Sequence, residues 1–404
     1  MLKKYHFLIF LLFSFVSTYA QNLLPDAPHI KTVIFNAYGA NNYVPIIRLG
    51  EKLQLRFDDL NGNETDYYYR IQHCDYNWEP SVISANEYIN GYAEDKISNY
   101  ENSFNTLQNY THYYETFPNA DTKFKISGNY ILTVKDEYDA VVFQRKFIIY
   151  KPKVNVGVAV YRSRNIASIN TQQAIEFSIN YENYRINNPK NEIVPVVLQN
   201  NNWNTAILGL KPQFYRGTQL LYKYNDETSF WAGNEFLHFE TKSIRNTNLY
   251  VSNVALLNLY NSYLYGNEPR FNQPYTLFPD INGNFIINAV EGDNANVDAD
   301  YSWIHFYLNN EKLADKKVYV YGNFNNWQLT NENLMTYNDE SGFYEGKLLL
   351  KQGFYNYQYV TVNTENTINN YEIDGSFYQT ENDYTVLVYY KPFGSRYTKV
   401  IGVG

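Results

Sequence analysis

The fold is decided by Val318-Tyr-Val-Tyr-Gly-Asn-Phe-Asn-Asn-Trp327 together with Gly342-Phe-Tyr-Glu-Gly-Lys-Leu-Leu-Leu-Lys-Gln-Gly-Phe-Tyr-Asn-Tyr-Gln-Tyr359. The first stretch reads as a strand that runs into an Asn-rich turn ending in Trp327. The second reads as an alternating strand that reaches Gly353, followed at once by an aromatic strand. This order of short strands and a polar turn is typical of a small immunoglobulin-like sandwich.

The same alternation of apolar and polar residues recurs along the chain, at 53–57, 67–71, 128–134 and 141–150. Helical spacing of apolar residues is scarce. The 43 Tyr and 25 Phe favour strands, and the many Asn favour turns. No repeat of fixed period indicates a propeller or a solenoid. We therefore predict an all-β protein built from tandem immunoglobulin-like β-sandwich domains.

Breaks in the pattern predict a linear domain order. Lys151-Pro-Lys153 interrupts the alternation, and the acidic, Asn-rich stretch 291–300 interrupts it again. We expect a signal peptide at 1–20, an N-terminal sandwich at 29–150, a middle sandwich at 151–292 and a C-terminal sandwich at 300–404. Within the middle part, Asn282-Gly283 predicts a hairpin turn that joins a strand ending near Phe278 to one at 285–288.

The first 20 residues predict export. Lys3 and Lys4 precede an apolar run at 7–15, and Ala20 is a small residue placed for cleavage before Gln21. The apolar run is shorter than the roughly 20 residues that a spanning helix needs. We expect cleavage between Ala20 and Gln21, and a mature chain without a transmembrane segment.

Composition and motif searches argue against several functions. The net charge is −8 and no basic cluster occurs, which argues against a nucleic-acid partner. The sequence has no G-x-S-x-G, H-E-x-x-H or P-loop motif, and no pair of His at metal-ligand spacing. We therefore expect no cofactor and no metal.

Two adjacent sets of reactive residues have structural explanations. In His73-Cys74-Asp75, neighbours on a strand point to opposite faces, so His73 cannot easily activate Cys74. Asp58-Asp59 lies at a strand end, where adjacent carboxylates do not flank a common bond. We expect a protein without catalytic residues, that is, not an enzyme.

A series of further segments occurs in a fixed order. They are Pro45-Ile-Ile-Arg-Leu-Gly50, Leu55-Arg-Phe-Asp-Asp-Leu60, Tyr67-Tyr-Tyr-Arg-Ile-Gln-His-Cys-Asp-Tyr-Asn-Trp-Glu-Pro-Ser81, Glu87-Tyr-Ile-Asn-Gly91, Gln199-Asn-Asn-Asn-Trp203, Ala232-Gly-Asn-Glu-Phe236, Asp280-Ile-Asn-Gly-Asn284, Leu350-Lys-Gln-Gly-Phe-Tyr-Asn-Tyr-Gln-Tyr359 and Thr380-Glu-Asn-Asp-Tyr384. In this order, over nearly the whole mature chain, they resemble the type IX secretion system plug protein family. The resemblance implies a periplasmic, non-enzymatic protein that binds the large outer-membrane translocon barrel of that system and occludes its periplasmic opening.

The segment 318–362 also resembles a glycogen-binding module of the family 48 carbohydrate-binding type. The turn with Asn325, Asn326 and Trp327 carries this resemblance, which makes these three residues the candidates for binding a ligand or partner. Such modules stack sugar on this Trp and on a second one, and 359–363 has no Trp. A periplasmic carbohydrate-binding protein is the alternative function.

Overall fold

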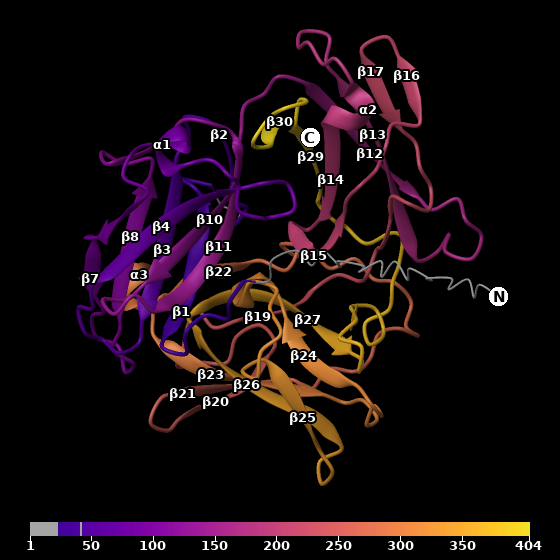
Figure 1. Cartoon of the computed structure of the whole chain (residues 1–404). Coiled ribbons are helices and arrows are strands. Elements are labelled where there is room, and N and C mark those ends of the chain that lie inside the picture. Colours follow the sequence, from indigo (N-terminus) through magenta and orange to yellow (C-terminus); the bar gives the residue numbers. More distant parts are fainter. Residues whose placement is uncertain (1–22, 41–42) are drawn as a thin grey trace, which may run out of the picture.

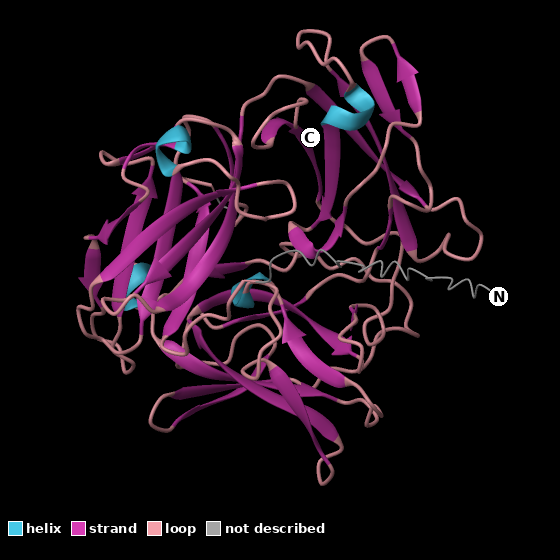
Figure 2. Ribbon diagram, in the orientation of Figure 1, coloured by secondary structure: helices cyan, strands magenta, loops and turns pink. Residues whose placement is uncertain are grey.

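The computed structural model describes residues 23–40 and 43–404. The predicted signal peptide and its cleavage point between Ala20 and Gln21 lie outside the described residues. Strands take 46% of the chain and helices 4%, which confirms the all-β class (Figure 2). Three β-sandwiches lie around a common centre: the first at the left of Figure 1, the middle one at upper right and the third below.

The first sandwich packs two antiparallel sheets face to face, with one parallel edge pair. One sheet has the order β1 (Ile30–Ala37), β3 (Leu53–Asp59), β8 (Thr111–Phe117), β7 (Tyr100–Asn102), and the other β2 (Ile46–Arg48), β11 (Val141–Tyr150), β10 (Gly128–Lys135), β4 (Tyr67–Cys74), β6 (Glu94–Ile97). Helix α1 (Ala85–Tyr88) and the pair β5 (Ile89–Gly91) and β9 (Thr122–Phe124) cover one end. The alternation seen in the sequence places Leu55 and Phe57 of β3 against Tyr67 of β4 in the core.

The middle sandwich is closed by the C-terminus of the chain. One sheet contains β12 (Asn155–Arg162), β13 (Gln172–Asn180), β17 (Gln219–Tyr222), β16 (Phe214–Arg216) and β18 (Ser229–Trp231). The other has the order β15 (Asn202–Ile207), β14 (Ile193–Gln199), β29 (Tyr384–Tyr390), β30 (Lys399–Val403), with α2 (Pro189–Glu192) before β14.

The third sandwich is a single ten-stranded sheet folded into two layers. Its strands are β19 (Leu237–Glu240), β20 (Val251–Leu256), β21 (Tyr260–Leu264), β22 (Phe285–Ile287), β23 (Tyr301–Leu308), β24 (Lys317–Tyr321), β25 (Leu334–Asn338), β26 (Phe343–Lys351), β27 (Gly353–Val362) and β28 (Ile368–Asn369), with α3 (Ala295–Asp298) and the 3-10 turn η1 (Asn323–Asn325). Strand β25 pairs with β24 in one layer and with β26 in the other, so it connects the two layers.

The strand pairing differs from the linear domain order that the sequence predicted. Strands β19 to β22 fall inside the range 151–292 but belong to the third sheet, and β29 and β30 fall inside 300–404 but pair with the middle one. The physical reason is that β29 is apolar on both faces. Val386 and Val388 enter the middle core, while Leu387 and Tyr389 face the first sandwich. Such a strand is stable only in an interior position.

The hairpin predicted at Asn282-Gly283 is also not formed. Both residues do have positive φ, 53° and 76°, as the turn requires. However, no strand precedes them in 271–280, and β22 pairs with β27 instead.

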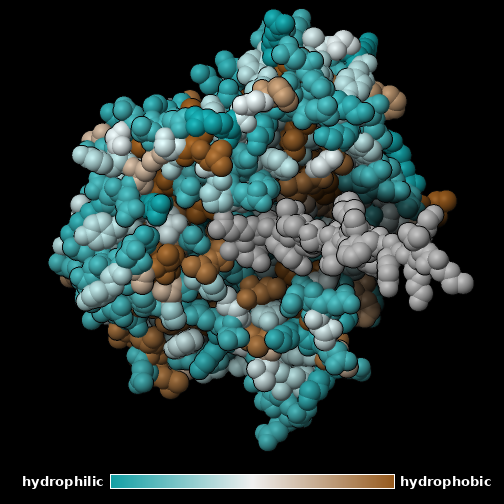
Figure 3. All heavy atoms as spheres, in the orientation of Figure 1, coloured by the Kyte–Doolittle hydropathy of each residue, from teal (hydrophilic) through white to brown (hydrophobic). Residues whose placement is uncertain are grey.

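Buried contacts join the first and middle sandwiches. Cys74 and Ile131 of the first pack with Val196 and Leu387 of the middle one in a shared apolar cluster. The Tyr389 hydroxyl adds a hydrogen bond of 2.7 Å to Asn129 across this contact. The face shown in Figure 3 is largely hydrophilic, with apolar side chains gathered in a few places.

Candidate functional site

The turn that carries the three candidate residues uses polar groups to hold its own shape. The Asn325 side chain donates to the Val320 carbonyl at 3.1 Å and accepts the Gly322 N–H at 3.4 Å. Asn326 has a φ of 55°, in the left-handed region that asparagine tolerates better than most residues. Asn325 and Asn326 therefore shape the turn, and they set the direction of Trp327.

Trp327 is buried, with 8% of its surface exposed. Its ring lies 5.1 Å from the ring of Tyr321 and 6.1 Å from that of Phe236, between centroids. A Cβ at Gly283 would come within 2.4 Å of the indole, so the glycine leaves room for the ring. The Trp327 carbonyl accepts a hydrogen bond of 2.9 Å from Asn204 of the middle sandwich. The residue thus contributes to the contact between two sandwiches, and little of its ring is exposed to solvent.

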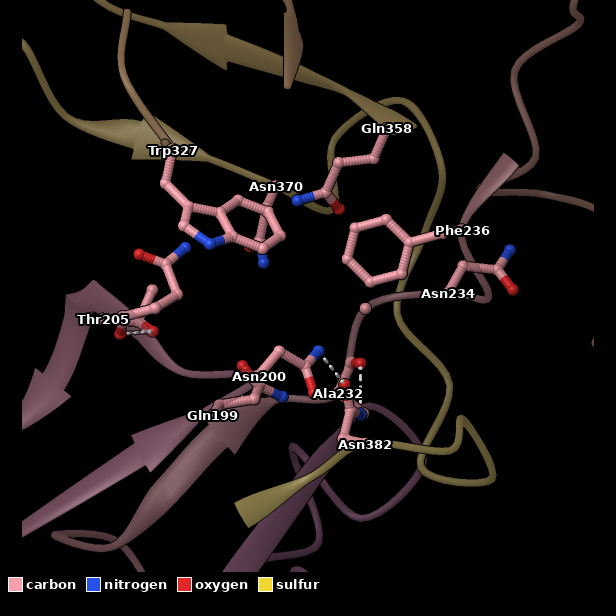
Figure 4. A pocket seen from close by; sticks show the side chains of 12 residues that line it. Gln199, Asn200, Thr205, Ala232, Asn234, Phe236, Trp327, Gln358, Asn370 and Asn382 are labelled. Atoms are coloured by element: carbon pink, nitrogen blue, oxygen red, sulfur yellow. Dashed lines mark hydrogen bonds between the residues drawn. The ribbon is translucent and has the colours of Figure 1, made fainter. Parts of the chain in front are cut away.

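A small polar hollow lies beside the indole, between the middle and third sandwiches (Figure 4). Seven of its twelve lining residues are carboxamides, and its free space of about 20 Å³ is room for about one water molecule. The Gln358 side chain points into the hollow and makes no hydrogen bond within the described residues. The residue is buried, with 7% of its surface exposed. Other amides tie the walls together, as Asn382 does by donating to the Ala232 carbonyl at 2.9 Å.

The pair His73 and Cys74 is split between two environments, as the alternation predicted. His73 lies in the first sandwich beside Ser81 (2.8 Å between Nδ1 and Oγ), and burial lowers its pKa to about 4. Cys74 points the other way, into the contact with the middle sandwich, and burial raises the pKa of its thiol to about 12. The neutral thiol is a poor nucleophile at physiological pH, because the thiolate is the reactive form.

Asp58 belongs to a buried ionic network between the first and third sandwiches, which we call the Asp58 network. Its carboxylate lies 2.7 Å from the Lys351 ammonium, 2.6 Å from His112 Nδ1 and 2.6 Å from the Tyr301 hydroxyl. Asp58 is fully buried and Lys351 is 1% exposed. Burial alone would raise the pKa of Asp58, but Lys351 and His112 outweigh it and hold the pKa below its ordinary value. The lysine also lies 4.1 Å from the ring centroid of Tyr110.

This network is not apparent from the sequence. Asp58 and Lys351 are 293 positions apart and lie in different sandwiches. The only hint is Lys351, which follows three leucines at the end of the β26 segment. A lysine in such a position needs a partner for its charge once it is buried. Asp59, the neighbour of Asp58, faces the other way and accepts a hydrogen bond of 2.9 Å from the Tyr67 hydroxyl.

Asp280 is a half-buried acidic residue next to the hollow. Its two oxygens accept the Asn282 N–H at 2.7 Å and the Phe236 N–H at 2.6 Å, so it organises the turn at 280–282. Burial, with a contribution from the neighbouring Glu235, raises the pKa of Asp280 to about 7. Within the described residues, no three His, Cys, Asp or Glu side chains are grouped so that they could hold a metal ion. Across 23–40 and 43–404 the structure has no helix long and apolar enough to cross a membrane.

Comparison with known proteins supplies the family. The sequence model of the type 9 secretion system plug protein 1st domain matches residues 30–151, which is the first sandwich. A crystal structure of a hypothetical protein from Parabacteroides merdae is similar over 95% of this chain and 98% of its own, with 34% identity and a TM-score of 0.91. No curated protein matches the chain. The segments noted in the sequence and the matched first domain agree: the chain belongs to the type 9 secretion system plug protein family.

Proposed function

We propose that the protein is a non-enzymatic periplasmic plug, which binds and occludes the periplasmic opening of the type IX outer-membrane translocon. The observation that carries this proposal, beside the family, is the way the three sandwiches are locked together. A body that blocks a wide pore must keep its shape when it is pressed against the opening. Independent domains joined by flexible linkers would not keep a fixed shape.

Two of the contacts between sandwiches are of kinds that resist separation. The shared apolar cluster around Cys74 and Leu387 would expose hydrophobic surface if the first and middle sandwiches parted. If the first and third sandwiches parted, the Asp58 carboxylate would lose its ion pair with Lys351 and its hydrogen bond from Tyr301. Both contacts join elements far apart in the chain, and together they support a rigid body.

The chemistry of the buried residues supports a binding role over a catalytic one. Cys74 is enclosed and its thiol is neutral, and His73 makes its Nδ1 contact with Ser81 inside the first sandwich. The carbohydrate alternative receives no support from the geometry, because Trp327 packs beside Tyr321 and Phe236 and only 8% of the residue is exposed. A platform for sugar needs an open aromatic face.

Affinity capture tests the proposal. The tagged full-length protein, extracted from membranes in mild detergent, should recover one outer-membrane protein of very high mass. A deletion strain should become sensitive to large antibiotics that the outer membrane excludes, and only while the translocon gene is present. Equal sensitivity with and without the translocon gene would overturn the plug function.

A further inference from the structure

Strand β20 ends the ten-stranded sheet and has a strand on one side only. It pairs with β21 from Val251↔Leu264 to Leu256↔Tyr260, and within 23–40 and 43–404 no strand pairs with its other side. Its six residues, Val-Ser-Asn-Val-Ala-Leu, include no charged residue and no proline. An edge strand of this kind offers a row of unpaired backbone N–H and C=O groups.

Two other edge strands, β12 and β15, have protection that β20 lacks. Strand β12 ends in Arg162, and Lys151 and Lys153 precede it. Positive charges at an edge strand discourage its pairing with a strand of another chain. Strand β15 is uncharged, but its Asn204 is bound to Tyr321 at 2.8 Å and to the Trp327 carbonyl. The β20 edge has neither kind of protection.

Apolar side chains surround the tip of the β20–β21 hairpin. Leu256 is 56% exposed and Leu257 is 68% exposed. The loop of the first sandwich with Phe104 and Leu107, 72% and 50% exposed, lies at the same end. The Leu107 N–H binds Asp300 just before β23, and Ser302 of β23 pairs with Tyr260 of β21. Figure 3 shows brown side chains gathered at the lower left, where Figure 1 places this hairpin.

We propose that β20 is a docking edge, which receives an extended segment of a partner protein as an added strand. The hydrogen bonds of the ladder would hold the backbone of the segment, and Leu256 and Leu257 would give it an apolar anchor. This inference rests on the proposed function, because it assigns to that binding role a surface and a mode of recognition.

The occupant we infer is a segment of a larger partner, and not a second copy of the chain. Six residues span about 20 Å, and pairing two such edges buries far less than the roughly 1,200 Å² typical of a stable interface. Two copies, each with a net charge of −8, also repel each other. The same negative charge disfavours an anionic lipid surface. A partner that makes a second contact elsewhere does not need this edge alone to supply the affinity.

The test uses the full-length protein and the outer-membrane partner that the wild type recovers. The variant Asn253→Lys/Ala255→Lys places two positive charges on the edge, and we expect at least tenfold less partner at equal protein concentration. The control is Val160→Lys on β12. The Val160 side chain is 47% exposed, and this variant should recover as much partner as the wild type. Thermal unfolding of both variants, measured in parallel, separates loss of docking from loss of folding.

Amide hydrogen exchange gives a second readout that does not depend on substitution. In the complex, peptides that cover 251–257 should exchange more slowly than in the free protein, because strand addition pairs their free amides. Unchanged exchange there, or full recovery by the folded double-lysine variant, would overturn the docking edge and leave the plug proposal intact. A crosslink from position 253 to a second copy or to lipid would overturn it as well. If the wild type recovers no outer-membrane protein, the proposed function itself fails.

Discussion

Replacing Lys351 by methionine should destabilise the protein by about 3–5 kcal/mol, the range for removing one partner of a buried ion pair. Lys351 is 1% exposed and its ammonium lies 2.7 Å from Asp58, which is fully buried. Methionine fills a similar volume, so the loss comes from the charge and not from a cavity. The Asp58 carboxylate would keep only His112 and Tyr301 as partners.

A second variant isolates the ionic contribution. In Asp58→Asn/Lys351→Met both charges are removed, while the asparagine oxygen can still accept from Tyr301. We expect this double variant to lose less than about 2 kcal/mol, because replacing a whole buried pair by neutral groups is often close to neutral. Urea unfolding at pH 7, followed by Trp fluorescence, gives the free energies. The matched control is Lys312→Met, which breaks the exposed pair with Asp339 and should cost below about 1 kcal/mol.

The double-mutant cycle decides whether the reasoning is right. With Asp58→Asn as the second single variant, the expected result is a coupling energy of about 2 kcal/mol or more between positions 58 and 351. If Lys351→Met behaves like Lys312→Met, or if the double variant is less stable than Lys351→Met alone, the Asp58 network does not lock the first and third sandwiches together.

Three further predictions concern the other buried groups. Burial raises the pKa of Asp280 to about 7, so the folded state binds an extra proton between about pH 4 and 7. The contribution of this group to stability should therefore fall as pH rises through that window. Glu235→Gln, which can donate to Asp280, should flatten that slope in urea titrations, and an unchanged slope would contradict the assignment. Cys74→Ser should keep partner binding and change stability by under about 2 kcal/mol, and the wild-type thiol should react with maleimide only in urea; fast labelling of folded protein would refute this. Trp327→Ala should cost about 3–5 kcal/mol, and wild-type protein should pass unretained through a glycogen or starch affinity gel; retention by that gel would favour the carbohydrate alternative.

Local alternation in the sequence was enough to find many strands. The stretches at 53–57, 67–71, 128–134 and 141–150 are β3, β4, β10 and β11, since one face of each is covered by the opposite sheet. The same rule predicts one outward Tyr in each consecutive pair. It holds for Tyr113, which is buried, and Tyr114, which is half-buried. It is wrong for Tyr389 and Tyr390, which are both buried because another sandwich covers the second face of β29.

Contacts distant in the sequence could not be predicted in this way. The alternation of residues says which side of a strand is apolar, but it does not say which sheet the strand joins. For this reason the sequence places 384–403 in the third sandwich, although β29 pairs with β14. The candidate turn at Asn325 to Trp327 was located correctly as a turn after a strand, but its burial depends on Phe236 and Asn204, which come from elsewhere in the chain.

The route of the chain explains how three small sandwiches act as one body. The chain leaves the middle sandwich after β18, builds the third sandwich, and returns to complete the middle one with β29 and β30. Strand β29 then contributes to two apolar clusters at once, through Val386 and Val388 on one face and Leu387 and Tyr389 on the other. The third sandwich is therefore held at both ends by the middle one, and the Asp58 network holds it to the first. No sandwich can move freely without breaking buried contacts in another, and this is the mechanical property that occlusion of a wide pore requires.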